Sequence, residues 1–340
     1  MPSATLLPKP AGAETPAPTG LFRHFYVWHT VFGRRVALWQ VVFVVLLVFC
    51  ITPWASPPIA LALGLGLAQT VGNPFPAHTR RLTQKLLQFS VIGLGFGMNA
   101  HAAVGAGKEG VLFTAVSIFG TLLLGYIAGK WLKLNQSVVH LISCGTAICG
   151  GSAIAAVGPV VGAKDEEMSV ALGTVFVLNA VALFVFPPIG HALALTQSQF
   201  GLWCAIAIHD TSSVVGAAAA YGDQALQVAT TVKLARALWI IPVSIGTAML
   251  FGQKSVVIKI PWFIFGFIGA MLLNTFVPAA QPVGPVLANL ARIGLTVTLF
   301  FIGAGLSAKV VRAIGVRPYV LGMLLWLAIS AASLYAIVAM

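Results

Sequence analysis

Long apolar segments recur along almost the whole of this sequence, and they constrain the fold more than any other feature. Eleven windows of about 20 residues are apolar enough to cross a lipid bilayer as helices. They lie near residues 36–52, 57–72, 86–104, 111–131, 139–161, 168–190, 199–220, 228–251, 260–277, 290–308 and 318–339. Apolar residues make up 59% of the chain and charged residues only 8%, which excludes an ordinary soluble domain. We therefore predict an all-α polytopic membrane protein with about 11 transmembrane helices.

The basic residues predict how the chain is oriented in the membrane. If the N-terminus is cytoplasmic, fourteen Lys and Arg residues fall in inner loops, whereas only Lys108 and Lys164 fall in outer loops. An excess of Lys and Arg marks cytoplasmic loops. We predict a cytoplasmic N-terminus and a C-terminus on the outer side. The net charge of +12 then reflects topology and attraction to anionic lipids, and no nucleic-acid partner is expected.

Residues 1–35 differ from the transmembrane region, which we place at 36–340. Residues 1–20 are rich in Pro, Ala and Thr and predict a disordered tail. Residues 21–35 mix aromatic and basic side chains, which fits either a segment on the membrane surface or a juxtamembrane linker. All four cysteines fall inside predicted spans, so we expect no disulfide framework, no metal site and no cofactor.

Small polar residues interrupt two of the predicted spans. Residues 143–152 read Ser-Cys-Gly-Thr-Ala-Ile-Cys-Gly-Gly-Ser, and residues 208–213 read Ile-His-Asp-Thr-Ser-Ser. Broken backbone at membrane depth is tolerated only where it is buried in protein or lines a cavity. Such discontinuous helices form the substrate sites of many transporters. The alternative is that these small residues simply allow close helix packing.

The second interruption contains an acid at membrane depth. Asp210 is the only acidic residue well inside an apolar segment, which makes it a candidate functional group. The alternative is a structural ion pair or a helix cap. His209 is next to it and suits proton transfer near neutral pH. We assign His209 and Asp210 to the coupling ion. We assign Asn99 and Asn179 to hydrogen bonds between helices, with a place in the polar centre as the alternative.

Two cations follow on the next predicted span. Lys233 and Arg236 are three residues apart and lie on one helical face. They either snorkel to the outer surface or turn inward toward an anion or Asp210. The low positive charge expected on that side favours the inward position. Arg292 begins a later span in a similar way, and both positions stay open for it.

These motifs resemble a known family. The segments 144–156 and 207–218, together with Val-Lys-Leu-Ala-Arg-Ala-Leu-Trp at 232–239, are similar to the YeiH-like family of sulfate exporters. The likeness runs from about residue 55 to the C-terminus. It implies a bacterial inner-membrane secondary transporter, related to the superfamily of cation/proton antiporters and bile-acid symporters. Members of that superfamily use inverted repeats and discontinuous helices.

Internal similarity also suggests inverted repeats. The segments 95–100 and 303–308 each end a predicted span and would face opposite ways. The interrupted segments also align, as Ala-Ile-x-x-x-Ser at 147–152 and at 207–212. Because these two lie two spans apart, we expect them to run parallel and not to be related by inversion.

Together, these features predict a proton- or sodium-coupled transporter that works by alternating access. Its substrate is a small anion, sulfate or a related oxyanion or organosulfonate, moved in the direction of export; a homodimer is left open. A cation/proton antiporter is the nearest alternative. An intramembrane enzyme is disfavoured because adjacent residues on one helix point about 100° apart, and a channel because no filter motif occurs. The predicted substrate-binding residues are Gly145, Thr146, Cys149, Gly150, Gly151, Ser152, Thr211, Ser212, Ser213, Lys233 and Arg236.

Overall fold

Helices make up almost all of the described chain. The computed structural model describes residues 28–31, 34–251, 262–306 and 315–339, so the predicted disordered tail at 1–20 lies outside the described residues. A short antiparallel hairpin pairs β1 (Trp28–Val31) with β2 (Arg34–Ala37). The helices are α1 (Leu38–Phe49), α2 (Pro57–Thr70), α3 (Pro76–Gly95), α4 (Ala100–Trp131), α5 (Gln136–Ala147), α6 (Gly151–Val157), α7 (Asp165–Ala192), α8 (Gln197–Ala207), α9 (Thr211–Tyr221), α10 (Asp223–Ala237), α11 (Ile240–Leu250), α12 (Trp262–Phe276), the 3-10 helix η2 (Pro278–Ala280), α13 (Gly284–Gly305) and α15 (Val316–Ala339).

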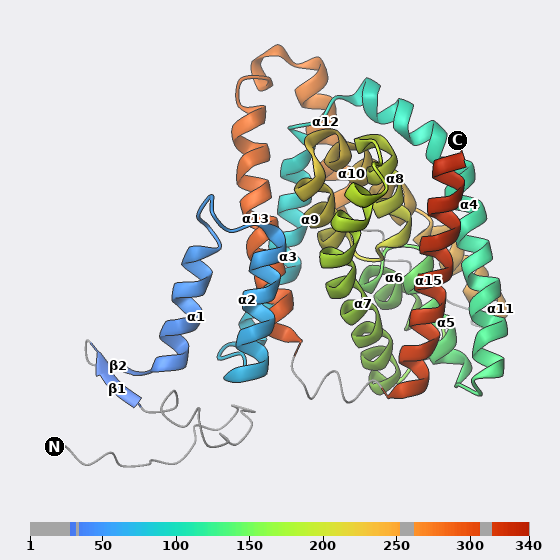
Figure 1. The fold of residues 1–340 in the computed structure, drawn as a ribbon, viewed down its shortest axis with the longest axis horizontal. Helices are drawn as coiled ribbons and strands as arrows, with labels where there is room; N and C mark the ends of the chain where they lie inside the picture. Colours follow the sequence, from blue (N-terminus) through green and yellow to red (C-terminus); the bar gives the residue numbers. More distant parts are fainter. Residues whose placement is uncertain (1–27, 32–33, 252–261, 307–314, 340) are drawn as a thin grey trace.

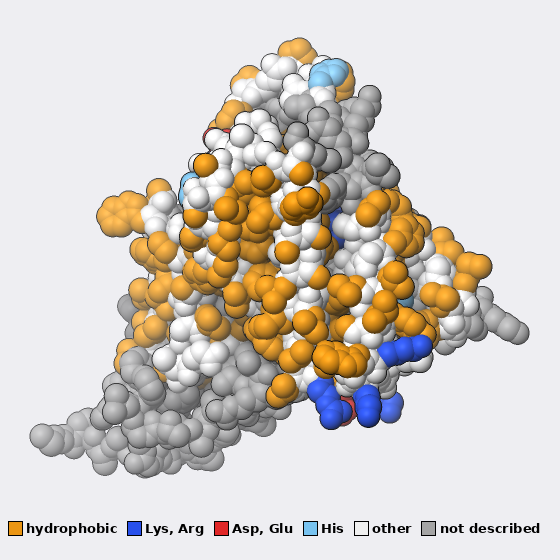
Figure 2. Space-filling view, turned by 45° about the vertical axis from the view of Figure 1, so that its right-hand side comes forward, with side chains coloured by type: hydrophobic (Ala, Val, Ile, Leu, Met, Phe, Trp, Pro, Cys, Tyr) orange, Lys and Arg blue, Asp and Glu red, His pale blue; other side chains and the backbone are white. Residues whose placement is uncertain are grey.

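Apolar side chains cover much of the outside of the molecule. Figure 2 shows hydrophobic side chains spread over one face, with Lys and Arg gathered at one end of it. Four stretches of helix are long and apolar enough to cross a membrane, namely Glu166–Ala192, Asp223–Leu250, Gly284–Gly305 and Val316–Ala339. The helices α1, α2 and α12 are shorter and also apolar. Apolar outward faces are what a hydrocarbon environment requires, so the prediction of an all-helical membrane protein is confirmed at this level.

The first hairpin, formed by α5 and α6, folds back at its break. A Cβ on Gly145 of α5 would lie 2.8 Å from Ile154 Cδ1 of α6, so the two helices run alongside each other. Just before α5, Asn135 Nδ2 donates a hydrogen bond of 2.8 Å to Glu167 Oε1 in the first turn of α7. Both ends of this segment therefore lie on one side of the molecule. The expectation that 139–161 forms a single span is wrong, because the segment is a re-entrant hairpin.

This correction also changes the side on which Lys164 lies. Lys164 is the N-cap residue of α7, next to the start of α5. It therefore lies on the same side as the loop before α5. The prediction that Lys164 lies in an outer loop is wrong. Of the two basic residues that the loop count placed on the outer side, Lys108 is then the one that stays there.

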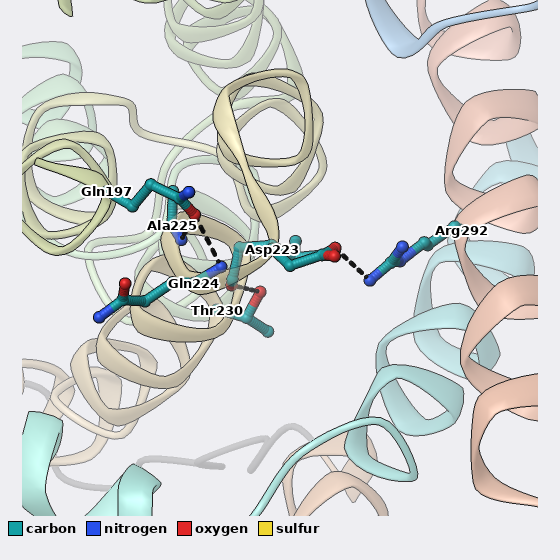
Figure 3. Close-up of polar contacts among 7 residues, drawn as sticks. Gln197, Asp223, Gln224, Ala225, Thr230 and Arg292 are labelled. Atoms are coloured by element: carbon teal, nitrogen blue, oxygen red, sulfur yellow. Dashed lines mark hydrogen bonds and ion pairs between the residues drawn. The ribbon is translucent and has the colours of Figure 1, made fainter.

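The second hairpin, formed by α8 and α9, is re-entrant in the same way. At its base, Gln197 Oε1 accepts a hydrogen bond of 3.0 Å from the backbone N–H of Gln224, which lies in the first turn of α10 (Figure 3). Tyr221 Oη, at the end of α9, donates a bond of 2.6 Å to Leu195 O, which precedes α8. The segment 199–220 was also expected to be a span. It enters and leaves on one side instead.

The two hairpins are related by inversion along the sequence. The base of the first lies at the N-terminal end of α7, and the base of the second follows the C-terminal end of α7. They therefore enter the molecule from opposite sides. The boundaries recur 60 residues later, because α5 ends at Ala147 and α8 at Ala207, while α6 begins at Gly151 and α9 at Thr211. The aligned Ala-Ile-x-x-x-Ser segments thus mark an inverted pair, contrary to the parallel arrangement expected from sequence.

The helices form two packed groups, visible on the two sides of Figure 1. The four-helix group consists of α2, α3, α12 and α13. Its backbones approach closely, since a Cβ on Gly64 of α2 would collide with Phe300 O of α13. The hairpin group consists of α4 to α11 and α15 and contains both hairpins. The second hairpin contacts the four-helix group, because a Cβ on Gly216 of α9 would lie 3.0 Å from Leu299 Cδ1 of α13.

Candidate functional site at the hairpin tips

The tips of the two hairpins meet inside the hairpin group. The first tip spans residues 148–150, between α5 and α6, and the second spans 208–210, between α8 and α9. Gly150 has φ +68°, a conformation that favours glycine. A Cβ at Gly150 would lie 3.3 Å from the carbonyl carbon and the carbonyl oxygen of His209. The predicted breaks in both helices are therefore present, and they touch.

Lys233 of α10 binds the end of α8. Its Nζ donates hydrogen bonds of 2.7 Å to Ile208 O and 3.3 Å to Ala205 O. The last carbonyl groups of a helix have no partners within the helix and carry the negative end of its dipole. A cation at this position stabilises the break. Lys233 is fully buried, so it turns inward rather than snorkelling.

Arg236 binds the end of α5 in the same manner. Its Nε donates a hydrogen bond of 2.6 Å to Ala147 O, and its Nη1 donates one of 2.9 Å to Ser117 Oγ of α4. Arg236 is also fully buried. One helix, α10, therefore presents two cations on successive turns, and each cation caps one of the two hairpins. Ser117 was not singled out from sequence, because serine is common in apolar helices and the motif carries no signal for it.

Asp210 acts as the N-cap of α9. Its Oδ2 accepts hydrogen bonds from the backbone N–H groups of Ser212 at 3.1 Å and Ser213 at 3.4 Å, and the Ser212 hydroxyl also donates to it. An aspartate in this position satisfies the free N–H groups of a helix start. The helix-cap interpretation left open from sequence is therefore part of its role. The residue is 9% exposed, in contrast to the fully buried His209.

Asn179 of α7 supports the second tip. Its Oδ1 accepts hydrogen bonds from the backbone N–H of His209 at 3.0 Å and from that of Asp210 at 3.3 Å. These two N–H groups lie in the break and have no helical partner. The predicted role of Asn179 in bonding between helices is confirmed, and the donors to it are backbone N–H groups of the tip. It thus links α7 to the site.

Several buried polar atoms around the tips have no hydrogen-bond partner within the described part of the chain. They are Thr146 Oγ1, Asn179 Nδ2, Arg236 Nη2 and both ring nitrogens of His209. Each belongs to a residue that lies in a tip, bonds to one, or lies in or bonds to the last turn of α5 beside the first tip. Buried polar groups are usually paired, so a cluster of unpaired ones marks a place suited to a polar ligand. Amide, guanidinium and hydroxyl groups are all hydrogen-bond donors.

The remaining predicted substrate residues lie at varied distances from this centre. Cys149, Thr211, Ser212 and Ser213 are buried at or beside the tips. Gly145 packs inside the first hairpin, as described above. The other predicted residues at the start of α6 are Gly151, where a Cβ would contact α7, and Ser152, which is exposed.

A small pocket, which we call the groove, lies between the hairpin group and the four-helix group. Arg292 of α13 lines it and forms an ion pair with Asp223 of α10, in which Arg292 Nη2 and Asp223 Oδ1 lie 2.8 Å apart (Figure 3). Arg292, whose position was left open from sequence, is thus partly exposed and contacts the other group. The groove is lined by Leu94, Gly97, Met98, Leu226, Gln227, Thr230, Ala288 and Arg292.

These features define a helical membrane protein built around two inverted re-entrant hairpins. The chain belongs to the UPF0324 membrane protein family, and the family described as Conserved hypothetical protein 698 matches residues 40–322. A UPF0324 membrane protein of Bacteroides thetaiotaomicron is 57% identical over 283 residues, covering 83% of this chain and 86% of its own length. One from Bdellovibrio bacteriovorus is 49% identical over 315 residues, covering 91% and 97%. The likeness to the YeiH-like family is confirmed, whereas no solved structure matches the chain.

Proposed function

We propose that the protein is a secondary active transporter of a small anion, sulfate or a related oxyanion or organosulfonate, that works by alternating access. The observation that carries this proposal is a surplus of buried positive charge at the hairpin tips. Among the described residues, the buried charged side chains are Asp210, Lys233 and Arg236, one acid against two bases. An unbalanced charge away from water is strongly unfavourable. An anion bound at the tips would balance it.

The unpaired donors support an oxyanion in particular. Arg236 Nη2, Asn179 Nδ2 and the Thr146 hydroxyl are buried beside the tips and free to donate. An oxyanion offers several acceptor oxygens, and a guanidinium binds such oxygens well. The site lies among apolar helices, where these bonds are stronger than in water. The unpaired donors at the tips therefore favour an oxyanion, and an anion would also balance the buried positive charge.

We assign ion coupling to the second tip. Asp210 is the buried acid of the described residues, and it keeps a small exposed fraction. Both ring nitrogens of the adjacent His209 are free of partners there. A proton taken up by either group would add to the positive charge at the site and strengthen anion binding. Anion and proton would then move together, although a sodium ion at Asp210 would serve the same purpose.

Two hairpins that enter from opposite sides suit alternating access. Each tip reaches the centre from one side, so displacing one hairpin would open the centre to that side alone. With both hairpins re-entrant, we count nine membrane crossings, with the N-terminus cytoplasmic and the C-terminus outside. We place the protein in the bacterial inner membrane and propose export as its direction. We propose transport rather than catalysis, since the Ser212 hydroxyl donates to the Asp210 carboxylate, which caps the same helix.

Flux measurements in proteoliposomes test this function. Vesicles containing the purified protein are given radiolabelled sulfate, with and without a proton or sodium gradient. We expect accumulation that depends on the gradient and that short-chain sulfonates inhibit. Arg317→Gln, an exposed charge at the start of α15, serves as the matched control and should transport normally. Absence of flux for sulfate and for sulfonates would contradict the proposal.

The cation/proton antiporter is the alternative that this experiment separates. In that case Asp210 would bind the cation and Lys233 would be its counter-ion, but the contacts of Lys233 Nζ are with Ala205 O and Ile208 O. In addition, Asp210 Oδ2 already accepts three hydrogen bonds from Ser212 and Ser213. Proton movement driven by a cation gradient, without any requirement for an anion, would favour this alternative.

A further inference from the structure

The ion pair between Arg292 and Asp223 joins the two helix groups beside the groove. Arg292 comes from α13 of the four-helix group, and Asp223 is the first residue of α10 in the hairpin group (Figure 3). It is the one ion pair between side chains of the described residues. The Arg292 side chain is 47% exposed and that of Asp223 80%. Exposed pairs of this kind contribute little stability, so the carboxylate is readily exchanged.

Below this pair, polar side chains continue along α10 toward the hairpin tips. Gln227 and Thr230 line the groove and lie one and two turns beyond Asp223. Lys233 follows one turn later. Exposure falls along this row, because Thr230 and Lys233 are fully buried. The row therefore connects the exposed ion pair with a cation of the central site.

The facing wall of the groove is apolar and carries a single guanidinium. This wall is formed beside Arg292 by Leu94 of α3, by Met98, which follows α3, and by Ala288 of α13. A guanidinium in such surroundings binds the oxygens of a carboxylate, a sulfonate or sulfate through paired hydrogen bonds. In the structure, the carboxylate of Asp223 takes this position. Arg292 therefore already binds a carboxylate of this chain.

We propose that Arg292 is an outer anion-binding site, where a small oxyanion displaces the carboxylate of Asp223 before it moves along α10 toward Lys233. This inference rests on the proposed function, since it concerns the same substrate. The Asp223 carboxylate competes with the oxyanion for Arg292, and its ion pair with Arg292 joins the two helix groups. Displacing Asp223 releases this connection, so binding at the outer site loosens the contact between the groups.

Equilibrium binding of sulfate tests this site independently of transport. Thermal unfolding of the purified protein is measured against sodium sulfate at constant ionic strength, because a ligand of the folded state raises its stability. We expect Asp223→Asn to lower the half-saturating sulfate concentration about fivefold, the size of a weak competing pair. Arg292→Gln should raise it about tenfold. Glu166→Gln and Arg317→Gln, exposed charges at the other end, should leave it unchanged.

Flux measurements on the same variants separate the two proposals. If sulfate binding follows Arg292 and Asp223 as expected but no vesicle transports an anion, the outer site stands and the transport function is wrong. If the wild-type protein transports sulfate while both variants bind and transport it normally, the outer site is wrong and the function stands. Arg292→Lys, which keeps the charge, should bind more tightly than Arg292→Gln. Equal binding by these two variants, or the absence of any sulfate effect, would overturn the outer site.

Discussion

Arg236 Nε donates a hydrogen bond of 2.6 Å to the carbonyl oxygen of Ala147, the last residue of α5. One turn earlier on α10, Lys233 makes the equivalent contact with Ile208 O at the end of α8. These two cations hold hairpins that come from opposite sides of the molecule. The site therefore depends on α10 as much as on the hairpins themselves.

Replacing Arg236 should weaken the first hairpin. Arg236→Gln removes a buried charge and leaves Ala147 O and Ser117 Oγ without their donor. Loss of a buried partner costs about 1–3 kcal/mol, so we expect a lower midpoint in thermal unfolding together with loss of sulfate binding. Arg236→Lys should keep part of the stability, because one ammonium cannot reach both acceptors as the guanidinium does. A midpoint equal to that of the wild-type protein in Arg236→Gln would contradict the capping role.

Gly150 should resist substitution by alanine. Its positive φ strains any other residue, and a Cβ would lie only 3.3 Å from the His209 backbone. We expect Gly150→Ala to destabilise the protein by about 1–3 kcal/mol and to reduce flux. Gly246→Ala in α11 is the matched control, because a Cβ there meets nothing within 4 Å and alanine favours helix. Equal thermal midpoints for the two variants would show that the tips are not in contact.

Asp210→Asn separates coupling from capping. Asparagine caps a helix about as well as aspartate, so the thermal midpoint should change little. Because the amide cannot take up a proton in the same way, we expect sulfate flux to lose its dependence on pH. Flux is measured at several pH values with no membrane potential. An unchanged pH profile would move the coupling ion away from Asp210.

The side of Lys164 tests the hairpin topology. A cysteine introduced by Lys164→Cys should react with a membrane-impermeant maleimide only from the side that carries Lys133, the cytoplasmic side. Positions 133 and 224 serve as references for the two sides, through Lys133→Cys and Gln224→Cys. A background without the four native cysteines is used. Labelling of position 164 from the outer side would restore the single span predicted at 139–161.

Sequence reasoning found both breaks but not their direction. Small polar residues within 143–152 and 208–213 indicate unwound backbone, and helices end within or beside these segments, at Ala147 and Ala207. However, the apolar runs at 139–161 and 199–220 are as long as a single span. Length and hydropathy cannot distinguish one crossing from two half-crossings that return. The repeated Ala-Ile-x-x-x-Ser pattern could have indicated that the segments turn back. Two such segments on either side of one span are related by inversion only if each returns to the side from which it enters.

The sequence predicted which residues form the site better than it predicted the role of each residue. The cost of buried charge led to the inward position of Lys233 and Arg236, and both are fully buried. Their acceptors are carbonyl groups 25 and 89 positions away, which no local pattern reveals. Asp210 is followed by Thr-Ser-Ser, a pattern also typical of a helix start. Its two roles could not be separated until the contacts of its carboxylate were known.

Binding of radiolabelled sulfate to purified Asn179→Asp tests the central claim most directly. An aspartate keeps an oxygen for the backbone N–H groups of His209 and Asp210, so the second tip should remain folded. It also removes the unpaired Nδ2 donor and adds a negative charge that cancels the buried positive surplus. We predict that the variant keeps a thermal midpoint close to that of the wild-type protein but loses sulfate binding at least tenfold. Wild-type affinity in this folded variant would contradict an anion site at the hairpin tips.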